Sequence, residues 1–289
     1  MKVAFIGLGV MGFPMAGYQQ AAGLDVTVYN RTTAKAQKWA EQYGGQFAST
    51  PAAASKGADV VMICVGNDDD VRSVVYGDDG IINGLTKGAL IVDHTTTSHQ
   101  LALELNEQCE AAGLGFIDAP VSGGQAGAEN GALAIMIGGD ADHLAQGLPA
   151  IELYAKTITH MGEVGTGQLT KMVNQVLIGG VLQGISEGFT LAQKTGLDLP
   201  KVIDAISGGA AGSWQLSNRG ENIDKDIFDY GFAVDWMVKD LGFCLDAAKK
   251  ADLKLPNTDF VIERYKELQA RGLNRCDTSV LIKQFDESS

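Results

Sequence analysis

Short apolar runs alternate with longer amphipathic stretches in the first half of the chain. Six runs read as buried strands, at residues 2–6, 25–29, 58–65, 88–95, 113–120 and 132–139. Helical stretches are expected between them, near 10–22, 33–43, 68–76 and 98–112. Strands that alternate with helices are typical of a parallel sheet covered on both faces. We therefore predict a doubly wound, mostly parallel α/β domain over residues 1–163.

After about residue 163 the strand patterns stop and helical patterns take over. A long helical stretch runs from 165 to 196, and further ones are expected at 200–207, 236–251 and 258–272. These patterns predict an all-α domain over residues 164–289, joined to the first domain by the long helix. Its most apolar part contains Gln175, Gln183 and Glu187, which is typical of a buried helix and not of a membrane span.

Length, net charge and the spacing of cysteines and histidines limit the number of domains and the classes of ligand. A chain of 289 residues is about right for two domains. A net charge of −13 argues against nucleic acid or a membrane as a partner, so an anionic ligand must be held by local positive groups. The four cysteines lie far apart and the histidines lack metal-ligand spacing, so we predict reduced thiols and no metal site. The chain opens directly on a strand pattern, and we expect a cytoplasmic protein.

The sequence GLGVMG at 7–12 follows the first strand and opens the first helix. In this context Gly7 permits the tight turn, Gly9 lets a pyrophosphate approach the backbone, and Gly12 lets the helix pack on the strand. The helix N-terminus would supply N–H groups to the phosphates. We predict that the whole turn, with Leu8, Val10 and Met11, binds a dinucleotide; a purely structural turn is the alternative.

The end of the second strand, YNRTT, indicates which dinucleotide. NAD-binding folds usually place a carboxylate there for the ribose 2′-OH, whereas this chain has Asn30, Arg31 and Thr32. The guanidinium of Arg31 suits a 2′-phosphate. We predict NADP as the favoured cofactor, with NAD possible; the alternative is that Arg31 is a solvated surface residue.

Three further stretches contain candidate substrate groups. In DAPVSGGQAGA, Ser122, Gly123 and Gly124 could form a nest for a carboxylate, or an ordinary turn. In GTGQLTKMVNQ, Lys171 and Asn174 share one helix face among apolar residues. Burial would lower the pKa of Lys171 towards that of a general acid or base, unless its ammonium reaches solvent. In WMVKDLG, Lys239 could contact cofactor or substrate, or form a surface ion pair.

In this order, these pieces resemble the β-hydroxyacid dehydrogenase family over nearly the whole chain. The matching segments are 5–16, 93–98, 118–124, 165–175, 208–214 and 239–242. The resemblance implies a Rossmann domain followed by a helical domain, an NAD(P)-dependent oxidoreductase activity, and a homodimer or homotetramer.

The resemblance also implies residue roles. Lys171 would be the catalytic acid/base, and the residues at 122–124 would hold the substrate carboxylate. Asn174 would position the substrate, and Lys239 would line the cleft beside both ligands. Cofactor contacts would come from the glycine turn, from Val65 and Thr96, and from the residues at 30–32.

The chain departs from its relatives in three places. Gln175 stands where many relatives have asparagine, His94 replaces a commoner apolar residue, and VGNDDDV at 65–71 replaces a Leu-Pro stretch.

We predict a reversible NADP(H)-dependent reduction of a small aldehyde acid of the semialdehyde or glyoxylate type. The alternatives are an NAD-dependent 3-hydroxyisobutyrate-type dehydrogenase, an imine reductase and a non-catalytic dinucleotide-binding module.

Overall fold

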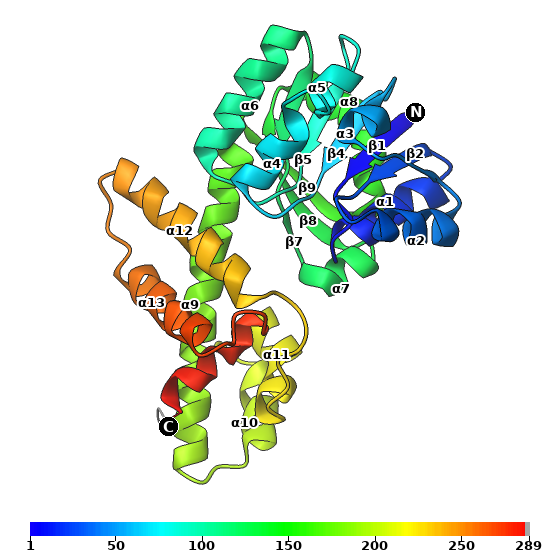
Figure 1. Cartoon of the computed structure of the whole chain (residues 1–289). Helices are drawn as coiled ribbons and strands as arrows, with labels where there is room; N and C mark the ends of the chain where they lie inside the picture. Colours follow the sequence, from blue (N-terminus) through cyan, green and yellow to red (C-terminus); the bar gives the residue numbers. More distant parts are fainter. Residues whose placement is uncertain (287–289) are drawn as a thin grey trace. The chain divides into compact units, whose positions relative to one another are not determined.

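Parallel strands form the centre of the first of two units in this computed structural model, which describes residues 1–286. The first unit, Met1–Lys171, contains one nine-stranded sheet in the order β3-β2-β1-β4-β5-β6-β8-β7, with β9 paired to β8 (Figure 1). Its strands are β1 (Lys2–Ile6), β2 (Asp25–Tyr29), β3 (Gln46–Phe47), β4 (Val60–Ile63), β5 (Leu90–Asp93), β6 (Gly115–Asp118), β7 (Val121–Ser122), β8 (Leu133–Gly139) and β9 (Ala155–Gly162).

The strands from β3 to β6 all pair in parallel, which confirms the predicted sheet type. The chain adds β2 and β3 on one side of β1, then crosses to add β4, β5 and β6 on the other. Ligands of open α/β sheets bind outside the carboxyl ends of the strands at such a switch point. The strand β8 runs antiparallel to β6, a reversal that the sequence pattern did not predict.

Helices cover both faces of the sheet. They are α1 (Gly12–Ala21), α2 (Thr33–Tyr43), α3 (Pro51–Ser55), α4 (Asp68–Val75), α5 (Ile81–Gly84), α6 (His99–Ala112), α7 (Gly124–Glu129) and α8 (Ala141–Ile151), followed by the 3₁₀ turn η1 (Glu152–Tyr154). Successive strand residues point to opposite faces. Val3 and Phe5 therefore join a core with α1, α2 and α8, while Ala4 and Ile6 join another with α4 and α6.

The second unit begins at Met172, and in the part that the structure describes all of its regular elements are helices. It contains the rest of α9 (Thr166–Lys194), then α10 (Leu199–Ser207), α11 (Trp214–Asp224), α12 (Val234–Lys250), α13 (Pro256–Ala270) and the 3₁₀ segment η2 (Thr278–Phe285). Its core includes Leu182, Met237 and Tyr265. The predicted boundary at 163 and 164 lies just before α9, whereas the two units divide inside that helix. The predicted domain extends to 289, and 287–289 lie outside the described residues.

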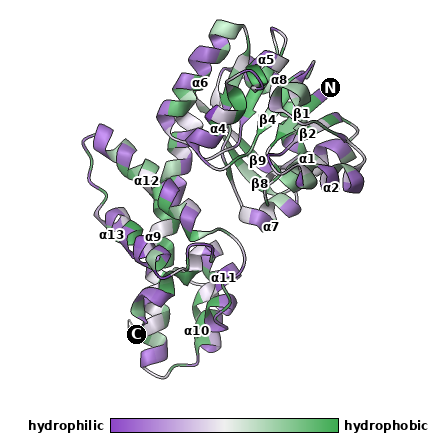
Figure 2. Ribbon diagram, in the orientation of Figure 1, coloured by the Kyte–Doolittle hydropathy of each residue, from purple (hydrophilic) through white to green (hydrophobic). Residues whose placement is uncertain are grey.

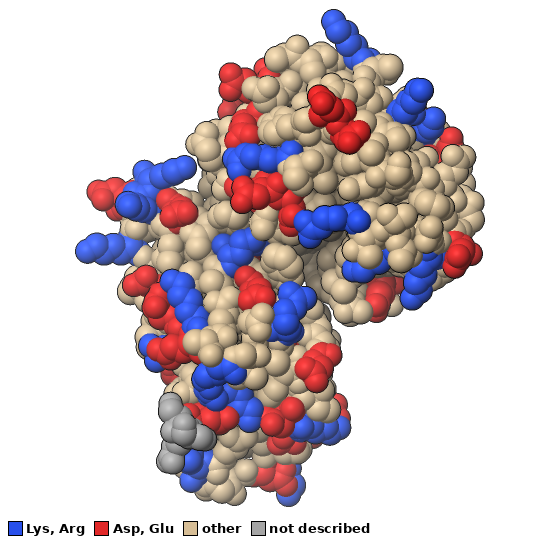
Figure 3. Space-filling view, viewed as in Figure 1, with Lys and Arg blue, Asp and Glu red and all other residues tan. Residues whose placement is uncertain are grey.

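Hydropathy follows these cores. The central strands are apolar, while the helices alternate apolar and polar residues (Figure 2). On the face shown in Figure 3, acidic and basic side chains are interspersed over both units. Within the described residues, none of the helices is long and apolar enough to cross a membrane.

Candidate functional site

The last residues of five parallel strands form one row across the sheet. Tyr29 pairs with Ile6, Ile6 with Ile63, Ile63 with Asp93, and Asp93 with Asp118. Most of the predicted cofactor and substrate residues of this unit follow directly after one of these strand ends. The register therefore brings segments that are far apart in the sequence to the same edge of the sheet, the edge where α/β folds bind ligands.

The glycine-rich turn after β1 is shaped by close backbone contacts. Gly7 has φ +101°, and a Cβ there would lie 2.2 Å from the carbonyl oxygen of Cys64. A Cβ on Gly12 would lie 2.1 Å from the carbonyl oxygen of Gly7. Around Gly9, by contrast, a Cβ would meet no atom of the described residues within 4 Å. Two of the glycines thus serve the turn itself, and the third borders open space.

The residues between these glycines differ in exposure. Leu8 is buried, Met11 is half-buried and Val10 is exposed. The backbone N–H of Leu8 donates to Oδ1 of Asn30 at 2.9 Å, and Nδ2 of Asn30 donates to the carbonyl oxygen of Thr32 at 3.0 Å. The Asn30 amide therefore joins the glycine turn to the end of β2.

Arg31 follows Asn30 and points into solvent, since its side chain is 85% exposed. Its guanidinium forms an ion pair with Asp70 of α4, with 3.1 Å between Nη1 and Oδ1. The adjacent Thr32 is also exposed and precedes α2. Arg31 is thus a cation at the edge of the sheet, but it has a carboxylate partner that the sequence pattern did not reveal.

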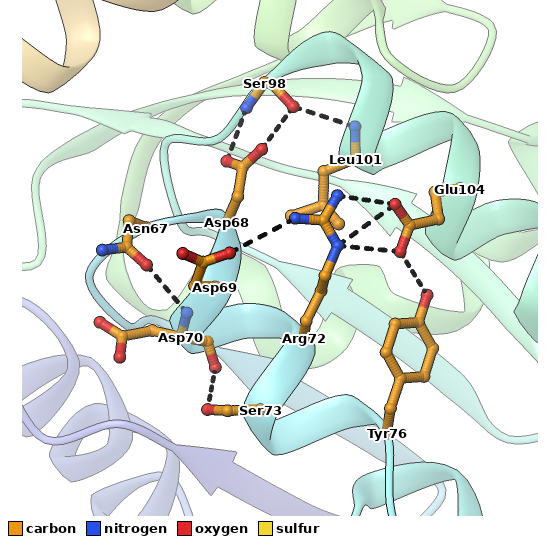
Figure 4. A network of polar contacts seen from close by, with 10 residues as sticks. All are labelled: Asn67, Asp68, Asp69, Asp70, Arg72, Ser73, Tyr76, Ser98, Leu101 and Glu104. Atoms are coloured by element: carbon orange, nitrogen blue, oxygen red, sulfur yellow. Dashed lines mark hydrogen bonds and ion pairs between the residues drawn. The ribbon is translucent and has the colours of Figure 1, made fainter.

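The loops after β4 and β5 are tied together. The N–H of Val65 donates to Oγ1 of Thr95 at 3.1 Å. Asp68 accepts hydrogen bonds from the N–H of Ser98 at 3.0 Å and from its hydroxyl at 2.5 Å (Figure 4). Thr96, one of the predicted cofactor contacts, is half-buried between these anchored positions.

The predicted carboxylate nest lies beyond β6. Ser122 ends β7 and is half-buried, and Gly123 and Gly124 both have positive φ, +138° and +62°. Gly124 is exposed and begins α7. The turn needs glycine at these two positions because other residues rarely adopt such a backbone.

The beginning of α9 is held by a carboxylate from the sheet. Asp118, fully buried at the end of β6, accepts the N–H of Gly165 at 2.6 Å and that of Gln168 at 2.8 Å. These are among the first N–H groups of the helix, which lack partners within it. A Cβ on Gly167 would lie 2.5 Å from the carbonyl oxygen of Met136, so glycine also permits this close approach.

A second contact joins α9 to the loop that carries Thr96. The Gln168 amide accepts the N–H of Thr97 at 3.1 Å and donates to the carbonyl oxygen of Thr95 at 2.8 Å. Lys171 follows three residues later, which places it on the same face of the helix. It is 8% exposed. The lysine therefore sits one turn beyond an amide that is anchored on both sides of Thr96.

Burial changes the acidity of three groups near this edge. It raises the pKa of Asp93 to about 7, opposed by hydrogen bonds from Thr95. It raises the pKa of Asp118 to about 6, opposed by the N–H groups that this side chain accepts. It lowers the pKa of His94 to about 4, and that ring lies between the carbonyl oxygen of Ala119 and the hydroxyl of Tyr154. His94 is therefore neutral at pH 7 and hydrogen-bonded on both sides of its ring.

In the second unit, a chain of polar contacts connects the two predicted substrate residues. Nδ2 of Asn174 donates to Oε1 of Gln175 at 2.8 Å, and Nε2 of Gln175 donates to Oδ2 of Asp240 at 2.7 Å. The ammonium of Lys239 lies 3.2 Å from Oδ1 of Asp240. Gln175 and Asp240 are each 2% exposed. We call these four residues the amide–carboxylate relay.

The Lys239 side chain is 18% exposed and also lies over two rings. Its ammonium is 5.7 Å from the ring centroid of Trp236 and 5.6 Å from that of Phe243. An ion pair was the alternative interpretation of this lysine, and the pair is present, but it is largely buried and not on the surface.

Sequence reasoning missed the residues that hold the predicted ones in place. Asp118 and Gln168 stood out only as members of longer motifs, and Asp70 only as part of the VGNDDDV segment that replaces a Leu-Pro stretch. A weak signal existed for Asp118, since an acidic residue that ends a buried strand needs donors nearby. Within residues 1–286, no group of three or more His, Cys, Asp or Glu residues is placed so that it could hold a metal ion.

Comparison with known proteins shows the family to which this chain belongs. Residues 2–162 match the model of the NAD binding domain of 6-phosphogluconate dehydrogenase, and residues 165–285 match that of the NAD-binding domain of NADP-dependent 3-hydroxyisobutyrate dehydrogenase. The chain belongs to the β-hydroxyacid dehydrogenase family. It is therefore an NAD(P)-dependent oxidoreductase, with the Rossmann-type and helical domains of this family.

Individual members of the family are similar along their whole length. An uncharacterized oxidoreductase of Shewanella frigidimarina is 54% identical over 99% of both chains. The 2-hydroxy-3-oxopropionate reductase of Escherichia coli is 34% identical over 99% of this chain and 97% of its own. The solved structure of Mycobacterium tuberculosis 3-hydroxyisobutyrate dehydrogenase has a TM-score of 0.88 at 30% identity and covers 99% of both chains.

The residues present fit the dinucleotide that the family uses. Gly9 borders open space at the N-terminus of α1, whose first turn has no acidic residue. Such a helix end attracts phosphate groups through its N–H groups and dipole. The cation that a 2′-phosphate would need is present at Arg31, on the neighbouring strand end.

Proposed function

We propose that this protein is an NADP(H)-dependent reductase of a small aldehyde acid, of the semialdehyde or glyoxylate type, and that the reaction is reversible. The observation that carries the proposal is the placement of Lys171. A buried lysine lies one helical turn from Gln168, whose amide is bonded on both sides of Thr96 at the carboxyl edge of the sheet. Relatives named for 3-hydroxyisobutyrate and 2-hydroxy-3-oxopropionate support a substrate that carries a carboxylate.

Lys171 is the proposed catalytic acid. Its ammonium donates a proton to the substrate oxygen as negative charge develops there, and it stabilises that charge before the transfer. In the reverse direction the neutral amine accepts the proton. The nicotinamide, when bound, supplies the hydride to the carbonyl carbon. Ser122, Gly123 and Gly124 are the proposed carboxylate site, since successive N–H groups of such a turn can bind an anion.

The remaining proposed roles belong mainly to the segments that come after the ends of the parallel strands. The turn at 7–12 binds the pyrophosphate, Val65 and Thr96 border the nicotinamide half, and the residues at 30–32 bind the adenosine half. Arg31 supports NADP over NAD because the end of β2 has no carboxylate to repel a 2′-phosphate. In the helical unit, Asn174 and Lys239 are proposed to bind substrate, with Lys239 also contacting cofactor.

We also propose a homodimer or homotetramer. Val173, Leu177 and Val181 recur every four residues on α9 and are 61%, 64% and 36% exposed. A second copy of the chain could cover such a stripe. The cytoplasm remains the proposed compartment.

The test follows NADPH and NADH oxidation with glyoxylate, tartronate semialdehyde, succinic semialdehyde and methylmalonate semialdehyde. We expect turnover of at least one of these with NADPH, and weaker turnover with NADH. Lys171→Ala should lower kcat by about 10² to 10⁴. NADPH binding, measured by fluorescence, should stay intact.

Lys194→Ala is the matched control, because Lys194 is an exposed lysine on the same helix. It should keep the wild-type kcat. A folded Lys171→Ala variant with wild-type kcat would contradict the catalytic role. Reduction of a cyclic imine together with inertness towards every aldehyde acid would contradict the carbonyl substrate.

A further inference from the structure

Three consecutive aspartates stand at the beginning of α4 (Figure 4), and their side chains have three different partners. Asp68 accepts two hydrogen bonds from Ser98. Asp69 is 95% exposed and lies 3.7 Å from Arg72 on its own helix. Asp70 forms the ion pair with Arg31. Only Asp70 contacts a residue that we assign to the cofactor.

The backbone of Asp70 is held in place on both sides. The side chain of Asn67 accepts its N–H at 2.8 Å and thereby caps α4. The hydroxyl of Ser73 donates to its carbonyl oxygen at 2.7 Å. The Asp70 side chain is 28% exposed, whereas that of Arg31 is 85% exposed. The carboxylate is thus the anchored partner, and the guanidinium is on a long chain in water.

We propose that Asp70 is a specificity-determining residue that weakens the preference of this protein for a 2′-phosphorylated nucleotide. This inference rests on the proposed NADP site at Arg31. A phosphate that reaches the Arg31 guanidinium must approach the Asp70 carboxylate, which lies 3.1 Å from that cation. The two anions repel each other and compete for the same N–H donors.

The same geometry predicts little effect on the unphosphorylated nucleotide. A ribose 2′-hydroxyl carries no charge for Asp70 to repel, and it can donate to a carboxylate. Asp70 therefore acts against one cofactor and not against the other. This arrangement lets Arg31 attract a 2′-phosphate without excluding NAD.

The experiment measures binding to the full chain by isothermal titration calorimetry with two probes, adenosine 2′,5′-bisphosphate and adenosine 5′-phosphate. Asp70→Asn should lower the Kd for the bisphosphate about fivefold, as expected for one partly screened charge pair. The Kd for the monophosphate should change less than about twofold. The gain should shrink as salt is raised, because exposed charges are screened.

Asp69→Asn is the matched control, since it removes the same charge from the neighbouring residue without touching Arg31. It should leave the ratio of the two Kd values unchanged. In an Arg31→Ala background, Asp70→Asn should lose its selective effect. The inference is overturned if Asp69→Asn tightens bisphosphate binding as much as Asp70→Asn does, or if neither variant changes it.

These outcomes separate the inference from the proposed function. If Arg31→Ala weakens bisphosphate binding but Asp70→Asn has no effect, the inference about Asp70 fails and the NADP site stands. If the wild type binds both probes equally and Arg31→Ala changes neither Kd, the NADP preference itself fails.

Discussion

The two units assemble their candidate residues by different means. In the first unit, mainly backbone features position the candidate residues. The strand ends lie in register, glycines occupy places where a Cβ would not fit, and Asp118 accepts hydrogen bonds from N–H groups at the beginning of α9. In the second unit, buried side chains do it, through the amide–carboxylate relay from Asn174 to Lys239. Positions such as Gly7 and Gly12 tolerate few substitutions because a Cβ there would collide with a backbone carbonyl oxygen. The contacts between side chains in the second unit can instead be removed by a single substitution that leaves the helices intact.

The largest expected effect comes from a substitution that disrupts the backbone geometry of the first unit. Gly7→Ala should destabilise the protein by about 4 kcal/mol, through a positive φ and a collision with the Cys64 carbonyl oxygen. Gly9→Ala, only two residues away, should change stability by less than about 0.5 kcal/mol because its surroundings are open. It should nevertheless weaken NADPH binding, since its Cβ would occupy the space next to the pyrophosphate.

Urea unfolding and NADPH fluorescence titration measure these two effects separately. Equal destabilisation by both alanines would show that the open space at Gly9 has no counterpart in solution. Unchanged NADPH binding by Gly9→Ala would remove the phosphate role of this turn.

Local sequence patterns were sufficient for most long elements and for the sheet edge. The helix expected at 33–43 has those bounds in the structure, because its pattern is regular and Gly44 ends it in a left-handed conformation. Short elements such as β3 and α5 carry too few residues to show a period. The direction of β8 in the sheet could not be predicted either, because the pattern of apolar residues does not indicate whether a strand pairs parallel or antiparallel to its neighbour.

The contacts that hold the site were not predictable for a different reason. Asp118 reaches Gly165 across 47 positions, Gln175 reaches Asp240 across 65, and Arg31 reaches Asp70 across 39. Such pairs depend on how whole elements pack, which a local pattern does not contain. Motifs therefore indicated candidate ligand contacts, and the structure was needed to show which residues hold these candidates in place.

The second largest effect concerns Asp118, whose side chain binds backbone N–H groups at the beginning of α9. It therefore combines the side-chain contacts of the second unit with the backbone geometry of the first. Burial raises its pKa from an ordinary 3.8 to about 6. Between these values the folded protein binds more protons than the unfolded chain, so stability falls as pH rises from about 4 to about 6 and is constant above. The loss from this group is up to about 3 kcal/mol.

Asp118→Asn should remove that part of the pH dependence, measured by urea unfolding at several pH values from 4 to 7. A slope from Asp93 should remain, because burial raises its pKa to about 7 in the same direction. Asp142→Asn, at an exposed position in α8, is the control for loss of one carboxylate. Identical pH profiles for Asp118→Asn and wild type would mean that Asp118 does not titrate as a buried acid.

The smallest effect tests the relay of the second unit. Gln175→Leu removes the amide that donates to Asp240, a carboxylate with 2% exposure, and the acceptor of Asn174. A buried acceptor without its donor costs about 1 to 2 kcal/mol, so stability should fall by that amount. Gln193→Leu makes the same change at an exposed position of α9 and should stay within about 0.5 kcal/mol of wild type.

Kinetics on the same pair of variants then distinguish a structural relay from one that positions substrate groups. If the relay only packs α9 against α12, Gln175→Leu lowers stability and leaves KM for the aldehyde acid unchanged. If it orients Asn174 and Lys239, KM rises while the Kd for NADPH is kept. Equal behaviour of the two leucine variants in both measurements would show that the helical unit does not depend on this buried chain of contacts, and the contrast between the two units would then reduce to the glycine turn alone.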